Sequence, residues 1–165
     1  MSTKNINQYL KLLLSMCAMF YVSLGLAFAV EKGTAPEAEA MVKKAVAYIK
    51  TNGAEKSYEE FTHGKLFKDR DLYIIVYDLN GKNLAQGANP KLVGKDLIGL
   101  KDPDGKPLIQ MFVDLAKSKG KGWVEGYKFL NPVTQKIEAK ACILNGLVIL
   151  WSAVESIKTK QQAIG

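Results

Sequence analysis

Residues 72–78 read LYIIVYD and are closely followed by Asn80-Gly81. Aromatic and β-branched residues at this density predict a strand, because their side chains pack well on a pleated surface. Asn-Gly adopts the backbone angles of a tight hairpin turn more readily than other pairs of residues. A second strand is expected over residues 83–86, so the centre of the chain predicts a β-hairpin.

Downstream of this hairpin, turn signals separate a helical segment from three further strands. Residues 87–106 are loop-like, with turn signals at Asn89-Pro90 and Asp102-Pro-Asp-Gly. Residues 107–119 predict a helix, because their apolar side chains recur on one side. Strands are then expected over residues 122–129, 136–143 and 147–154, joined by turns at Asn131-Pro132 and Asn145-Gly146.

Upstream of the hairpin the sequence predicts a long helix. Thr34 and Glu37 have the spacing of a capping box. Pro36 suits the first turn, and Gly53 can end the helix. Apolar residues recur between them every three or four positions, which gives the helix one face for packing. A shorter helix is expected over residues 55–61.

The elements therefore come in the order helix, helix, strand, strand, helix and three strands. Two hairpin signals and three closing strands favour antiparallel pairing, and a sheet of this kind needs helices to cover it. The predicted fold class is α+β, with a five-stranded antiparallel sheet, a long N-terminal helix and further helices packed on the sheet.

The first 30 residues have the composition of an export signal. Lys4 and Lys11 are their only charged residues, and 27–29 is a small-x-small sequence that suits a signal peptidase. We expect residues 1–29 to be a cleaved signal peptide, which makes the domain periplasmic or secreted. The alternative is an uncleaved anchor in the inner membrane, because the apolar run of residues 12–30 is just long enough to span a bilayer.

The rest of the chain suffices for one domain. We expect this domain to span residues 30–155 and the polar residues 156–165 to form a tail. Of the two cysteines only Cys142 lies beyond the leader, so no internal disulfide is expected and the fold depends on its core. Without the leader's two lysines, 21 basic residues stand against 16 acidic ones, a net charge of +5.

Several motifs resemble those of one protein family. YDLNG, NPKLVGK, LKDPDGKP, GWV and NPVT occur in the order and at the spacing found in the single Cache domains of bacterial extracytoplasmic sensors. The similarity covers residues 35–154. It implies a PAS-like sheet, a long N-terminal helix across that sheet, and a pocket for a small ligand. Family members often recognise small carboxylates or similar metabolites.

The chain departs from the family pattern at four places. Gln86 stands where the family usually has His, and Gly126 is an extra residue between Trp123 and Tyr127. Ala141-Cys142 replaces a hydroxyl residue and a tyrosine, and the last strand reads WSAVES instead of a glycine-rich stretch. The sequence shows no second apolar span and no output module, so we expect a free-standing member that does not itself relay a signal.

Four aromatic residues are candidates for the ligand site. Trp123 and Tyr127 offer ring surfaces with one donor each, and a bulge at Gly126 would re-aim one ring relative to the other. Tyr73 and Tyr77 share one face of the first strand. Ordinary core packing is the alternative interpretation of all four side chains.

Two polar residues complete the candidate site. Lys140 stands in a largely apolar strand and can pair with a carboxylate, with a solvated strand face as the alternative. Gln86 can donate and accept hydrogen bonds, with a hairpin edge in water as the alternative. Asp102 and Asp104 lack the further acidic ligands of a calcium loop, so we interpret them as turn residues and predict no metal site.

The residue types argue against catalysis and against nucleic-acid binding. His63 is the only histidine and lies in a polar stretch, so neither a catalytic pair nor a zinc site is indicated. The basic residues are scattered among acidic ones instead of clustering. We therefore predict no enzyme activity, no cofactor and no nucleic-acid partner.

A small-molecule ligand is the expected partner, and a membrane receptor is a second one. The alternative function is a docking module of the cell envelope whose pocket is closed. Pairing of the long first helix with a second copy of the chain stays open, because its polar face shows no clear seam.

Overall fold

The computed structural model describes residues 32–146 and 148–153. The predicted leader, residues 1–29, and the predicted tail, residues 156–165, lie outside the described residues. The described elements are α2 (Ala35–Asn52), α3 (Ala54–His63), β1 (Lys68–Asp69), β2 (Leu72–Tyr77), β3 (Asn83–Gln86), the 3-10 helix η1 (Pro90–Leu92), α4 (Leu108–Lys119), β4 (Lys121–Leu130), β5 (Ile137–Asn145) and β6 (Val148–Ala153).

The described strands form one antiparallel sheet. β6 pairs along one side of β2, while β1 and β3 pair along its other side, at different ends of the strand. β5 and β4 continue the sheet beyond β6, which gives the order β3-β2-β6-β5-β4. The predicted α+β fold is confirmed. The two-residue strand β1 was not predicted, because so short a segment carries no alternation of apolar and polar residues.

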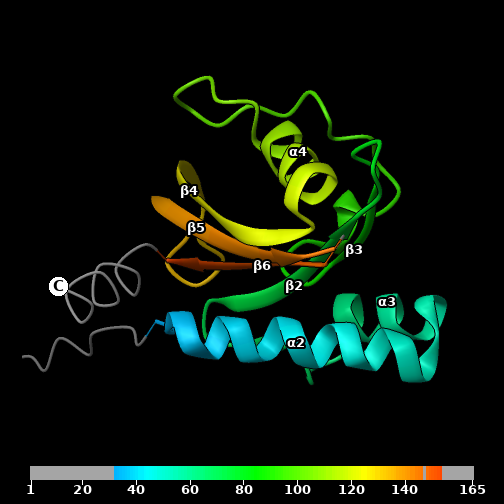
Figure 1. Cartoon of the computed structure of the whole chain (residues 1–165). Coiled ribbons are helices and arrows are strands. Elements are labelled where there is room, and N and C mark those ends of the chain that lie inside the picture. The colour runs from blue at the N-terminus through cyan, green and yellow to red at the C-terminus, as the bar shows by residue number, and fades with distance from the viewer. Residues whose placement is uncertain (1–31, 147, 154–165) are drawn as a thin grey trace, which may run out of the picture. The chain divides into compact units, whose positions relative to one another are not determined.

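Helices cover both faces of this sheet, α2 and α3 on one face and α4 on the other (Figure 1). Val42 of α2 and Phe61 of α3 belong to one buried cluster with Ile74. Phe112 of α4 belongs to a second cluster with Tyr127. All six residues of β2 are buried as a result. A strand covered on both faces reads as a continuous apolar run, which is why LYIIVY does not alternate.

The start of α2 is fixed by polar contacts that the sequence predicts in part. The capping box is present: the backbone N–H of Thr34 donates to the Glu37 carboxylate at 2.7 Å, and the N–H of Glu37 donates to the Thr34 hydroxyl at 3.5 Å. Arg70 lies 2.8 Å from the same carboxylate. Its guanidinium and the Thr34 donors lower the pKa of Glu37 from 4.5 to about 2. The helix ends at Gly53, as predicted.

The loop between η1 and α4 is docked on β4 by one carboxylate. Asp102 accepts hydrogen bonds from the backbone N–H groups of Asp104 and Lys106, both at 2.9 Å, and from that of Lys128 in β4 at 3.0 Å. Desolvation alone would raise the pKa of Asp102, but these three donors outweigh it and lower the pKa. The interpretation of Asp102 as a turn residue is confirmed.

Candidate functional site

A bulge in β4 decides which face of the sheet its two aromatic rings occupy. The register of β4 on β5 shifts between Val124 and Tyr127, where β4 accommodates one extra residue. Gly126 has a φ of 75°, in the left-handed region that favours glycine. Because side chains alternate along a strand, the extra residue puts Trp123 and Tyr127 on opposite faces. A bulge is therefore present at Gly126, and it separates the two rings.

Trp123 lies on the face that α2 covers. It packs against the buried pair Ala35 and Ala141, and its indole N–H donates to the Glu39 carboxylate at 3.4 Å. This placement ties Trp123 to the start of α2. It puts the ring on the opposite face from Tyr73 and Tyr127.

Tyr127 lies on the α4 face but inside the core. Its side chain is fully buried, and its ring meets that of Phe112 edge-on with centroids 5.7 Å apart. Its hydroxyl lies beside the Cys142 thiol. Burial raises the pKa of Tyr127 well above its ordinary value and that of Cys142 to about 12. Both groups are therefore neutral core residues at physiological pH, and the interpretation of Cys142 as a buried apolar residue is confirmed.

Tyr73 and Tyr77 share the α4 face, as the alternation along β2 predicts, but they meet different surroundings. Tyr77 borders a void of about 10 Å³ with Phe112 and Ile149, which has room for one water molecule at most. Tyr73 lies at the other end of β2 and borders a much larger cavity. Burial is the main cause that raises the pKa of each tyrosine.

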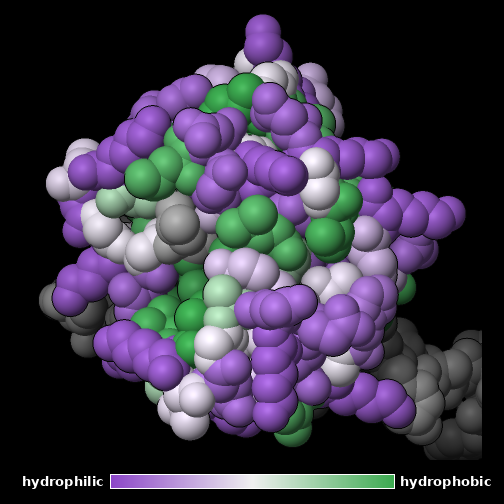
Figure 2. All heavy atoms as spheres, turned by 90° about the vertical axis from the view of Figure 1, so that its right-hand side faces the viewer, coloured by the Kyte–Doolittle hydropathy of each residue, from purple (hydrophilic) through white to green (hydrophobic). Residues whose placement is uncertain are grey.

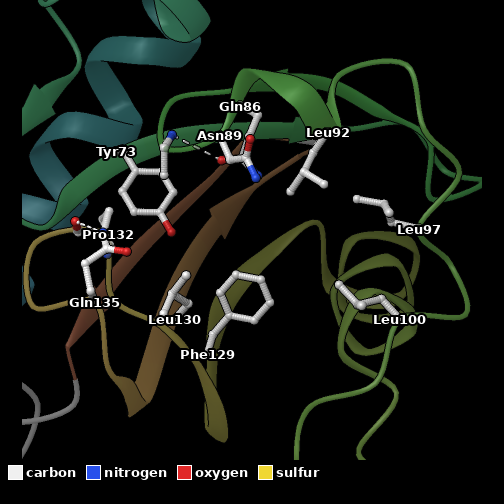
Figure 3. Close-up of a pocket in the computed structure, with 11 residues that line it drawn as sticks. Tyr73, Gln86, Asn89, Leu92, Leu97, Leu100, Phe129, Leu130, Pro132 and Gln135 are labelled. Carbon is white, nitrogen blue, oxygen red and sulfur yellow. Dashed lines mark hydrogen bonds between the residues drawn. The ribbon is translucent and has the colours of Figure 1, made fainter.

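The cavity beside Tyr73 is the candidate ligand site. Its volume is about 440 Å³, within the range of pockets that hold small organic molecules. It lies between β2, β3, the loop from Ala88 to Leu100, the end of β4 and the β4–β5 turn (Figure 3). The lining residues are Tyr73, Gln86, Ala88, Asn89, Leu92, Leu97, Leu100, Phe129, Leu130, Pro132 and Gln135.

The lining is divided into a polar side and an apolar side. Tyr73, Gln86, Asn89 and Gln135 lie together on one side of the cavity, and the leucines and Phe129 lie around the rest (Figure 3). Gln86 is only 3% exposed, yet its amide points into the cavity. A buried polar group is held most favourably when a partner satisfies it, so this amide is the natural anchor for a ligand.

Two of the six residues proposed from the sequence, Tyr73 and Gln86, line this cavity. Lys140 does not line it. Its ammonium is fully buried and forms an ion pair with Asp71, itself 1% exposed, at 3.7 Å. Burial lowers the pKa of Lys140, and the nearby carboxylates of Asp71 and Glu138 oppose that shift. Lys140, which we proposed from the sequence as the partner of a ligand carboxylate, is therefore paired with the carboxylate of Asp71 instead.

Sequence reasoning missed the apolar wall of the cavity. Leu92, Leu97 and Leu100 come from a segment that was interpreted only as a loop with turn signals. The signal that could have found them is their spacing: apolar residues recur between the glycines and lysines of residues 91–100, where a solvated loop would be polar throughout. Phe129 and Leu130 end β4, where the strand leaves the core.

Metal binding finds no support among the described residues. No group of three or more His, Cys, Asp or Glu side chains within residues 32–146 and 148–153 is placed to hold a metal ion. Helices of the described part are all too short or too polar to cross a membrane.

The fold is that of a known family. A family model described as single Cache domain 2 matches residues 4–146. The chain belongs to this family. Cache domains are extracytoplasmic sensor domains of chemotaxis receptors, so membership makes this protein a sensor-type domain and confirms the resemblance that the motifs indicated.

Solved structures share the fold of this Cache domain. A methyl-accepting chemotaxis protein from Vibrio parahaemolyticus RIMD 2210633 aligns with a TM-score of 0.58 and 23% identity over 72% of this chain and 86% of that chain. A Cache chemosensory domain described for carboxylic acid recognition aligns with a TM-score of 0.55 and 21% identity over 93% of this chain and 98% of that chain. A periplasmic sensor domain of a chemotaxis protein has a TM-score of 0.55 and 24% identity, covering 71% and 86% of the two chains.

One curated relative is similar in sequence. The methyl-accepting chemotaxis protein McpP of Pseudomonas putida is 36% identical over 72 residues, which are 44% of this chain and 13% of that protein. The Cache domain described here therefore corresponds to a small part of that receptor.

Proposed function

We propose that this Cache domain binds a small molecule in the cavity beside Tyr73, and that it does so outside the cytoplasm. The observation that carries the proposal is the cavity itself: about 440 Å³, largely apolar, with the buried amide of Gln86 pointing into it. Pockets of this composition hold a ligand's carbon skeleton against the apolar wall and orient the ligand with few polar groups. The family resemblance favours a small carboxylate or a similar metabolite.

The open cavity favours ligand binding over the docking-module alternative. A docking module with a closed pocket would have large side chains filling this space. It would also be expected to present a contiguous apolar patch to its partner. The face shown in Figure 2 is mostly hydrophilic, with hydrophobic residues in small separate groups.

A thermal-shift screen of the purified protein tests the proposal. Small carboxylates, amino acids, amines, amides and purines are added singly, and the melting temperature is measured. A ligand at 100 times its Kd stabilises the folded state by about 2.7 kcal/mol, which for a domain of this size raises the melting temperature by roughly 8 °C. A saturable shift is expected.

Two variants locate the binding. Gln86→Ala removes the buried amide and should abolish the shift, whereas Trp123→Phe alters the opposite face and should retain it. If no compound shifts a cooperative melting transition, the docking-module alternative replaces this proposal.

We further propose that residues 1–29 are removed on export, which leaves the domain periplasmic or secreted, and that a membrane receptor is its partner. The small-x-small sequence of residues 27–29 supports cleavage. Mass spectrometry of the protein from the cell envelope should find a chain that begins at Val30. A chain that retains residues 12–30 and sediments with the inner membrane would establish the uncleaved anchor instead.

A further inference from the structure

The lining of the cavity contains no charged side chain. The 11 residues that line it carry one tyrosine hydroxyl and three side-chain amides as their polar groups, and the rest are apolar. Lys140, the cation expected for a carboxylate, is outside the lining and is paired with Asp71. A carboxylate that enters this cavity would lose hydration without meeting an opposite charge, which is costly in an apolar environment.

Local hydrogen bonds fix the orientation of the three amides. The Gln86 oxygen accepts from the backbone N–H of Ala88 at 3.4 Å, and the Asn89 oxygen accepts from that of Lys91 at 3.2 Å. Because a backbone N–H only donates, the oxygen must be the atom that faces it. The NH₂ groups of Gln86 and Asn89 are therefore the ends that remain for a ligand, and both are donors.

Gln135 presents the opposite end of its amide. Its NH₂ group donates to the backbone carbonyl of Pro132 at 2.6 Å, so its oxygen remains as an acceptor. The polar side of the cavity thus offers donors at Gln86 and Asn89 and an acceptor at Gln135, all of them uncharged. A carboxylate can use the donors but has no hydrogen for the acceptor, whereas an amide group supplies a carbonyl and an N–H together.

The size of the cavity sets the size of the ligand's body. A volume of about 440 Å³ lies within the range of pockets that hold small organic molecules. A two- or three-carbon acid would leave most of this space to water against a wall of leucines and Phe129. A ligand with a ring or a chain of about six carbons would cover that wall and bury apolar surface.

We propose that the cavity selects an uncharged ligand with an amide-type head, in which a carbonyl and an N–H stand side by side, on an apolar body. Primary amides, lactams and the edges of nucleobases belong to this class. The inference rests on the proposed function, since it names the ligand class of the same cavity, and it replaces the small carboxylate that the family resemblance favours.

Matched acid and amide pairs test the ligand class by isothermal titration calorimetry on the purified protein at pH 7. The pairs are hexanoate and hexanamide, phenylacetate and phenylacetamide, and nicotinate and nicotinamide, so the members of each pair share one skeleton. The amide is expected to bind at least about ten times more tightly than its acid, because the charge of the acid meets no opposite charge in the lining of the cavity.

Two variants test the role of Gln86, the first as the test and the second as its control. Gln86→Glu replaces the buried NH₂ donor by a carboxylate oxygen and should weaken amide binding at least about tenfold. Trp123→Phe, on the opposite face, should leave it unchanged. If the acids bind as tightly as their amides, the inference is overturned and the proposed function stays intact. The same holds if none of the six compounds binds and the wider screen finds a charged ligand instead. A protein that no compound in the wider screen stabilises overturns the proposed function itself.

Discussion

Asp71→Asn removes the negative charge that faces Lys140 and leaves the shape of the side chain nearly unchanged. The Lys140 ammonium is fully buried and lies 3.7 Å from the Asp71 carboxylate. At this separation two unit charges attract by about 4 kcal/mol when the effective dielectric constant is about 20. Removing one partner of a buried pair costs about 3–5 kcal/mol, because the remaining charge is left without compensation. Glu138 also acts on Lys140, so we expect a loss near the lower end, about 3 kcal/mol.

A double-mutant cycle separates the charge from the packing. The four proteins are wild type, Asp71→Asn, Lys140→Met and the double variant, and urea-induced unfolding gives the free energy of unfolding of each. Asparagine can still accept the hydrogen bond that the Gly33 N–H donates to Asp71 at 2.7 Å, and methionine fills much of the volume of lysine. The double variant should therefore be more stable than Asp71→Asn alone, since neither charge is then buried. A single-variant loss below about 1 kcal/mol, or losses that simply add, would refute the reasoning.

Three further predictions follow from local features. Gly126→Ala should cost only about 1 kcal/mol in thermal or urea unfolding, because its Cβ would meet the Lys106 ammonium at an ordinary contact distance of 3.6 Å and only the positive φ is penalised. Deleting Gly126 should cost far more, since the deletion moves one half of β4 to the wrong face. In a Cys17→Ser background, Cys142 should resist thiol reagents until the protein unfolds, because burial raises its pKa to about 12; rapid labelling in the folded state would contradict this. The pKa of Glu37 is lowered from 4.5 to about 2 in the folded state, so its contribution to stability is complete above pH 4.5 and is lost as the pH falls towards 2. In Glu37→Gln, the midpoint of urea unfolding should therefore depend less on pH over that range than in the wild type.

Local sequence signals predicted the elements of this fold well. Thr34, Glu37 and Gly53 mark the ends of α2 because caps act through neighbouring residues, so no tertiary information is needed to recognise them. The same holds for the strand over residues 83–86, which the structure reproduces without change. The bulge at Gly126 was also recognisable, because an extra glycine inside a strand has few other uses.

The candidate site was predicted less completely, because its composition depends on which faces and which strands meet. The sequence indicated that Gly126 would re-aim a ring, but not that Trp123 would turn towards α2. The partner of Lys140 depends on the strand order, since β6 lies between β5, which carries Lys140, and β2, which Asp71 immediately precedes. No local sequence pattern predicts this strand order. Gln86 was singled out because it stands where the family usually has His, and Tyr73 because of the alternation along its strand. Leu97 and Leu100 were missed because their segment was interpreted only as a loop with turn signals.

The contacts of Asp102 on β4 also bear on how this protein behaves at high concentration. β4 is the last strand of the described sheet, and an exposed edge strand is a template on which another chain can pair and start aggregation. The backbone N–H of Lys128 is already engaged by Asp102, and the carbonyl of Gly126 accepts from the Lys106 ammonium. The bulge bends the same stretch away from a regular ladder. The loop before α4 therefore protects this edge, and Asp102→Ala should promote self-association before it affects the cavity.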